Sequence, residues 1–227
     1  MKKMTFYSEL AYLLGLLLVA VGTAFMTLAD FGLSMVAAPS YILHLGLSER
    51  FEFLSFGVCD YLAQTVILII MMLVLRKFRI TYFFSFVTAV LYGCILDLVL
   101  IPASLLSVGG MALRVVYFIA GLVIVPMGVA LLFRTYLAPG VHELFVKEIV
   151  SHFKLDTGKT KTVYDCIFCL LSVALSFAFF GLWQFRGVGI GTIVCALVNG
   201  AIIGAFAKLY DKLFDFKDRW ALRKYFE

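Results

Sequence analysis

The sequence has few charged residues. Lys, Arg, Asp and Glu together make up 15% of its 227 residues, while 63% of the residues are hydrophobic. An average soluble domain carries roughly 25% charged residues. A water-soluble fold has too little interior to bury so large an apolar fraction, so the composition excludes an ordinary soluble domain and predicts a protein whose surface faces lipid.

Motifs of catalytic and metal chemistry are also missing. There is no H-E-x-x-H, no G-x-S-x-G and no acidic cluster suited to a metal ion. His44, His142 and His152 lack ligand-like spacing with the five cysteines. Cys166 and Cys169 form a C-x-x-C inside an apolar run, without the exposed helix start and βαβ pattern of a redox pair. We therefore expect no enzyme activity, no metal and no cofactor.

The sequence does contain six apolar runs, each long enough to cross a bilayer as a helix, which takes about 20 residues. They cover residues 10–28, 54–75, 82–101, 113–133, 163–183 and 188–207. The expected fold is an all-α polytopic membrane protein with six transmembrane helices.

Basic residues are distributed unevenly between the segments that join these runs. With the N-terminus inside, all but three of the 19 Lys and Arg residues fall on the inner side, the exceptions being Arg50, Arg114 and Arg186. Cytoplasmic segments carry such an excess. The pattern predicts that both termini are cytoplasmic, and it explains the net charge of +5 by contact with anionic lipid headgroups rather than with nucleic acid.

The chain contains an internal repeat. GLLLVAVG from Gly15 recurs as GLVIVPMG from Gly121, so that Gly22 matches Gly128 at the same offset. One run further on, Asp60 matches Asp165 with one residue less between them.

This repeat divides the chain into three parts. We expect a first three-helix repeat over 1–104, a second over 109–207 and a cytoplasmic amphipathic tail over 208–227. Because each repeat has an odd number of spans, the two copies enter the bilayer from opposite sides, as inverted repeats do.

In each repeat the first apolar run ends in a break, which is followed by a segment too short to span. These segments are apolar at 36–47 and amphipathic at 141–153, and we expect a re-entrant or interfacial helix from each. Facing breaks form the central site in many transporters. The residues of the breaks are candidates for substrate binding: Asp30, Gly32, Ser34, Arg134, Pro139, Gly140 and Glu143. An ordinary external loop at the first break, and an Arg134 that only reaches the interface, are the open alternatives.

Four polar residues lie inside predicted spans and complete the candidate solute site: Asp60, Gln64, Asp165 and Asn199. Asp60 and Gln64 are four residues apart and share a helix face. An ionisable residue in a membrane helix costs roughly 2.5–3.5 kcal/mol and by default indicates a functional site. A place for Asp60 near the helix end, in reach of water, is the alternative.

Several of these residues form a pattern that resembles the YitT/YczE-like family of small bacterial membrane proteins. The pattern comprises a glycine-rich first helix, Ala29-Asp30-Phe31-Gly32, Pro139-Gly140-x-x-Glu143, Asp165 and Gly191-Thr192-Ile193-x-x-Ala196-Leu197-x-x-Gly200. The resemblance covers Gly15 to Phe206 and implies a bacterial inner-membrane location and a transport role, without a substrate. Met35 stands where relatives tend to have proline, and Ile190 where they have an acidic residue, so the solute is expected to differ if these positions line the site.

Together these observations predict a secondary transporter that moves a small polar or anionic solute by alternating access between two inverted repeats. The expected partners are this solute and the lipid bilayer, with proton coupling through Asp60 and Asp165 and a homodimer both left open. Two alternatives remain. One is a substrate-binding membrane subunit of a larger importer, and the other is a membrane scaffold or regulator that transports nothing.

Overall fold

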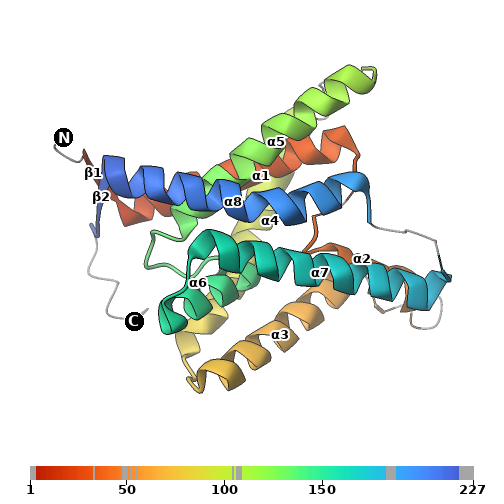
Figure 1. Cartoon of the computed structure of the whole chain (residues 1–227), viewed down its shortest axis with the longest axis horizontal. Helices are drawn as coiled ribbons and strands as arrows, with labels where there is room; N and C mark the ends of the chain where they lie inside the picture. The colour runs from red at the N-terminus through yellow and green to blue at the C-terminus, as the bar shows by residue number, and fades with distance from the viewer. Residues whose placement is uncertain are drawn as a thin grey trace.

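The computed structural model describes residues 4–32, 34–47, 51, 53–54, 56–103, 105, 109–182 and 188–219, and its elements are labelled in Figure 1. Six helices are long: α1 (Ser8–Ala29), α3 (Phe56–Leu75), α4 (Phe84–Ala103), α5 (Met111–Leu132), α7 (Thr157–Phe180) and α8 (Ile190–Leu213). The shorter elements are α2 (Ala38–Leu47), α6 (Val141–Phe153), the 3-10 helix η1 (Ile80–Phe83) and the strands β1 (Met4–Tyr7) and β2 (Phe214–Lys217).

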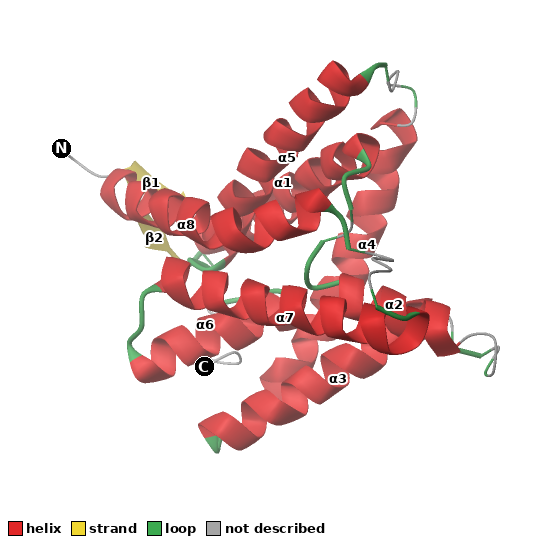
Figure 2. Cartoon of the chain, turned by 45° about the vertical axis from the view of Figure 1, so that its right-hand side comes forward, coloured by secondary structure: helices red, strands yellow, loops and turns green. Residues whose placement is uncertain are grey.

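Helices dominate the fold, as Figure 2 shows. All six long helices are apolar enough and long enough to cross a membrane. The predicted all-α architecture of a multi-pass membrane protein is therefore confirmed, and the two short helices occur where the short segments were expected.

Two helix boundaries differ from the sequence-based expectation. The fifth apolar run predicts a span that begins at residue 163, but α7 begins at Thr157 because the Asp156 side chain caps it, accepting a hydrogen bond from the Lys159 amide at 2.9 Å. At the other end of the chain, α8 extends through Leu213 and leads directly into β2. The tail expected over 208–227 thus begins as the last turns of α8 and a strand, and residues 220–227 lie outside the described residues.

The order of elements is the same in both halves: a long helix, a short helix and two long helices. The contacts are also paired, since α1 packs on α4 as α5 packs on α8, and α2 packs on α3 as α6 packs on α7. Each short helix also packs on the other half, α2 against α7 and α6 against α3. The halves are not identical, because α7 packs along much of α8 whereas α3 and α4 make little contact.

The closest packing between the halves is the crossing of α1 and α5, which run in opposite directions (Figure 1). An added Cβ at Gly128 would lie 2.7 Å from the Gly15 carbonyl oxygen, and one at Gly121 would lie 2.7 Å from the Gly22 carbonyl oxygen. Gly15 therefore contacts Gly128, which is the repeat equivalent of Gly22, and Gly22 contacts Gly121, which is the repeat equivalent of Gly15. Glycine allows this close approach of two backbones in a membrane.

The short helices begin half-way along the long ones. Met35, which precedes α2, belongs to a buried cluster with Cys169 at the middle of α7, and Gly46 near the end of α2 contacts Phe179 at the end of α7. Val141 at the start of α6 is in a cluster with Leu68 at the middle of α3. From these starting points α2 and α6 run toward opposite ends of the molecule (Figure 1).

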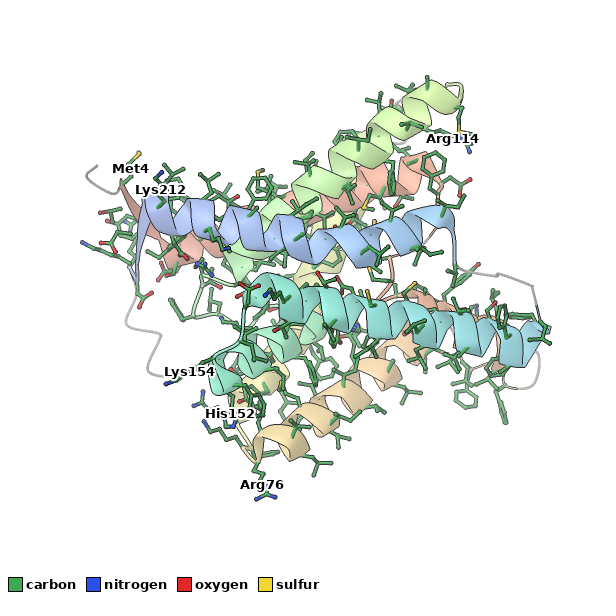
Figure 3. The ribbon with its side chains drawn as sticks, viewed as in Figure 1. Met4, Arg76, Arg114, His152, Lys154 and Lys212 are labelled. Atoms are coloured by element: carbon green, nitrogen blue, oxygen red, sulfur yellow. The ribbon has the colours of Figure 1, made fainter. Side chains whose placement is uncertain are left out.

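The two ends of the described chain meet. β1 and β2 pair in parallel, with Thr5 opposite Asp215. This pairing places the start of α1 and the end of α8 on the same side of the molecule. In Figure 3, Met4, Arg76, Lys154 and Lys212 all lie toward this side, whereas Arg114 lies at the opposite end. Arg114, which the sequence assigns to the outer side, is thus far from these four residues, while Arg50 and Arg186 lie outside the described residues.

Candidate functional site

Three residues on one face of α7 form the centre of the candidate site. Lys161, Tyr164 and Asp165 are spaced three and four residues apart, which aligns them along the helix. All three are buried, Asp165 completely and Lys161 with 3% of its surface exposed. Charged groups are almost never buried this far in proteins unless they are paired.

The start of α6 supplies the partners. The Lys161 ammonium lies 2.7 Å from Asp165 Oδ1 and 3.9 Å from Glu143 Oε1. His142 Nδ1 lies 2.8 Å from the Tyr164 hydroxyl, in hydrogen-bond contact. We call these five residues, His142, Glu143, Lys161, Tyr164 and Asp165, the α6–α7 cluster.

The charges in this cluster do not balance. Two carboxyl groups share one ammonium group, so with both carboxylates ionised the cluster carries one excess negative charge. His142 adds no positive charge, because burial, together with the nearby Lys161 ammonium, lowers the pKa of His142 to about 3.

The first half has a smaller polar cluster in the corresponding place. Gln64 Nε2 donates to Asp60 Oδ2 at 2.6 Å, and the buried Ser40 hydroxyl at the start of α2 also hydrogen-bonds to Asp60. The two carboxylates that the repeat related, Asp60 and Asp165, thus each lie beside the start of a short helix. Asp60 is half-buried and is the fifth residue of α3, so both its place in the site and the alternative of a carboxylate in reach of water stay open.

Buried oxygen atoms remain without hydrogen-bond donors in the described part of the chain. They are Oε1 of Gln64, Oδ1 of Asn199 and Oδ2 of Asp165, whereas Oδ1 of Asp165 is paired with the Lys161 ammonium. Leaving such an acceptor unsatisfied costs about 1–3 kcal/mol.

Asn199 belongs to the same region as the α6–α7 cluster. It is 6% exposed and lies on the buried strip of α8 between Cys195 and Ile203. Cys195 is in electrostatic contact with Asp165, and Ile203 shares a buried cluster with Tyr164. The position of Asn199 between them places it level with the Lys161–Asp165 pair.

The first break does not join this cluster. Asp30 ends α1 in a left-handed conformation, its side chain is 78% exposed, and it lies 3.7 Å from the Arg114 guanidinium at the start of α5. Gly32 packs against the backbone of Gly189. Ser34 is exposed, and its carbonyl oxygen accepts hydrogen bonds from the amides of Ala37 and Ala38 at the entry to α2. These three residues secure the end of α1 and the entry to α2.

The second break is more deeply buried, but its arginine is engaged elsewhere. Arg134 donates to both carboxylate oxygens of Asp211 at 2.6 Å and to the Ala207 carbonyl, and so ties the break to the end of α8. Pro139 and Gly140 are the residues immediately before α6, which has no side-chain cap at Gly140. They lead the chain into α6, whose first turn contains Glu143.

The sequence reasoning missed Lys161 and the His142–Tyr164 pair. Lys161 precedes the predicted fifth span, and from the sequence it counts only among the basic residues of the inner side. A signal was available, because Lys161 and Asp165 have the four-residue spacing of a helical ion pair.

The described residues contain no group of three or more His, Cys, Asp or Glu side chains placed to hold a metal ion. The five cysteines are all free thiols.

Comparison with known proteins gives one match. The model of DUF6198, described as a family of unknown function, matches residues 6–208. No curated protein and no solved structure matches the chain. The resemblance to the YitT/YczE-like proteins stays a prediction.

Proposed function

The chain belongs to DUF6198, a family of unknown function, and we propose from its structure that it is a secondary transporter that moves a small polar solute by alternating access. The observation that carries the proposal is the buried Lys161–Asp165 pair, inside a helix long and apolar enough to span the membrane. A structural helix gains little from two buried charges, because desolvation offsets most of their attraction. Such groups within membrane helices mark solute and ion pathways.

The packing of the two halves supports the mechanism. The reciprocal contacts of Gly15 with Gly128 and of Gly22 with Gly121 are those of two equivalent helices related by a twofold axis. We interpret the halves as inverted repeats, in agreement with the paired contacts of α2 with α7 and of α6 with α3. Rocking of one such repeat against the other opens a central site to either side in turn.

Helix starts at the middle of the molecule supply a second support. α2 and α6 both begin there and run outward in opposite directions, and the polar residues Ser40 and Glu143 lie in their first turns. We propose that the solute binds between these starts, beside Asp60 and Asp165, and that one of these carboxylates carries a coupled proton. The asymmetry of basic residues supports a place in a bacterial inner membrane with both termini cytoplasmic.

The test is a thermal-shift screen of the purified protein in detergent. The panel contains small metabolites that are cationic, neutral or anionic, each at pH 5.5 and pH 7.5. A ligand that binds only the folded protein raises its apparent stability with the logarithm of its concentration. Compounds that shift the wild type are then assayed for counterflow in proteoliposomes.

We expect one compound class to stabilise the wild type, Asp165→Asn to lose that response, and the same class to exchange across the vesicle membrane. Binding without counterflow, together with co-purification of a cytoplasmic ATPase, would replace the proposal with a subunit of a larger importer. Absence of any response in the wild type, with both Asp60→Asn and Asp165→Asn unchanged, would overturn the solute site and favour a scaffold or regulator.

A further inference from the structure

The structure assigns a charge to the solute. We propose that the α6–α7 cluster, together with Asn199, binds a small organic cation, and that the ammonium group of this solute displaces Lys161 from Asp165. This inference rests on the proposed function and specifies its substrate class. It departs from the anionic solute that the sequence left open.

The first argument is the electrostatic imbalance. Glu143 and Asp165 lie 3.9 Å and 2.7 Å from a single ammonium group, that of Lys161. Asp60 adds a carboxylate in the other half, and its hydrogen-bond partners in the described part of the chain, Gln64 and Ser40, are neutral. A second cation would balance the charge of the α6–α7 cluster, whereas an anion would place a third negative charge next to one ammonium.

The second argument is the kind of hydrogen bond that is missing. The buried atoms without a partner in the described residues are acceptors, namely Oδ2 of Asp165 and the side-chain carbonyl oxygens of Asn199 and Gln64. Asp165 and Asn199 lie on two packed helices, α7 and α8, and Cys195, one helical turn before Asn199, is the electrostatic neighbour of Asp165. A ligand that satisfies them has to bring N–H or O–H donors, and an ammonium group has up to three.

The third argument is the aromatic surface beside the pair. The Lys161 nitrogen lies 5.3 Å from the centre of the Tyr164 ring, which is packed against Phe168 at 4.6 Å and Phe145 at 5.3 Å. Ring faces attract ammonium and guanidinium groups, and organic cations gain from the apolar contact as well. The place occupied by the lysine ammonium therefore already has the surroundings of an amine-binding site.

The remaining cations of this region are not free to bind an anion. Arg134 is held by Asp211, and the Lys147 ammonium donates to the Thr135 carbonyl oxygen. The ring nitrogen of His142 that faces Tyr164 is hydrogen-bonded.

These contacts define how the exchange proceeds. The solute ammonium binds Asp165 and the Asn199 carbonyl oxygen, and Lys161 shifts toward Glu143, which is already 3.9 Å away. When the solute leaves, Lys161 returns to Asp165 and restores its neutral pairing. No bond is made or broken, and the charge on Asp165 is balanced in both states.

The experiment measures the thermal shift of the full chain in detergent with propylammonium, tetramethylammonium, sodium, acetate and phosphate salts at equal ionic strength. We expect propylammonium to stabilise the wild type and sodium, acetate and phosphate to have no effect. Because Lys161 competes with the solute, Lys161→Gln should lower the propylammonium concentration for the half-maximal shift at least tenfold. Lys159→Gln, on the exposed face of the same helix turn, is the matched control and should leave it unchanged.

A second variant keeps the test valid if Lys161→Gln does not fold. Asn199→Leu removes a buried acceptor without a donor, so we expect it to fold, and it should weaken the propylammonium response at least tenfold. Three results would overturn the inference: stabilisation by acetate or phosphate but not by propylammonium, stabilisation by sodium alone, or a propylammonium response that neither variant changes. The first two leave the transporter proposal standing with another solute, while the screen described above tests that proposal by itself.

Discussion

The burial of His142 predicts how the stability of the protein depends on pH. Burial and the Lys161 ammonium lower the pKa of His142 from its ordinary 6.5 to about 3 in the folded protein. Between these two values the unfolded chain binds a proton at this residue and the folded chain does not. The free energy of unfolding therefore falls as the pH drops from 6.5 toward 3.

The size of the effect follows from the same two pKa values. Between pH 7 and pH 5 His142 alone should lower the free energy of unfolding by about 2 kcal/mol. For a protein of this length that corresponds to a fall in Tm of about 4–8 °C.

The assay is the Tm in detergent of the wild type, His142→Gln and His152→Gln between pH 7 and pH 5. Gln keeps a hydrogen-bonding group opposite the Tyr164 hydroxyl but cannot be protonated. Between pH 7 and pH 5 the Tm of His142→Gln should therefore fall less than the Tm of the wild type, and the difference should be about 4–8 °C. His152 is exposed near the end of the same helix, and its replacement should leave the pH dependence unchanged. Equal pH dependence in all three proteins would refute the neutral state of His142 and, with it, the excess negative charge of the cluster.

Three further outcomes are expected. Gly128→Val should lower the free energy of unfolding by at least about 1–3 kcal/mol, because the valine side chain would collide with the backbone of α1. Gly93→Ala is the control and should be tolerated, since an added Cβ there meets no atom within 4 Å. Thermal melts measure both effects. The pair of Arg134 and Asp211 should show a coupling free energy of about 0.5–1 kcal/mol in a double-mutant cycle. The double variant Arg134→Asp with Asp211→Arg should recover part of the stability that each single change loses. Additive effects of the single changes would contradict the ion pair. A C-terminal green fluorescent protein fusion should fluoresce in bacteria if the end of α8 faces the cytoplasm as we propose, and an active alkaline phosphatase fusion at the same point would overturn that orientation.

Most of the fold was predictable from the sequence because a membrane-spanning helix requires a long run of apolar residues, which hydropathy identifies directly. A run of about 20 apolar residues has few alternatives in lipid, so the six spans and the two short segments were recognised from hydropathy alone. The start of α7 was not recognised, because Thr157, Gly158 and Lys159 are typical of a loop. The local cap at Asp156 and the packing of Gly158 on α8 extend the helix through these residues.

The candidate site was predicted only in part, since proximity in sequence does not give proximity in space. Asp165, Glu143 and Asn199 were named from residue type and repeat position, and the structure places them in one region. Arg134 and Asp30 were named by the same reasoning, but each has its charged partner at another helix end. Which carboxylate meets which cation depends on how eight helices cross, and the pattern of a single chain does not determine that.

The parallel pairing of β1 with β2 has a consequence for biosynthesis. β1 leaves the ribosome first, but it can pair only after β2 has been synthesised, some 210 residues later. Glu9, next to this strand, accepts hydrogen bonds from the Arg219 amide, 210 residues later, and from the Tyr136 hydroxyl in the second break, 127 residues later. The membrane insertion of all six helices therefore comes before the closure of this end, and a chain that stops short of β2 is inserted but left open.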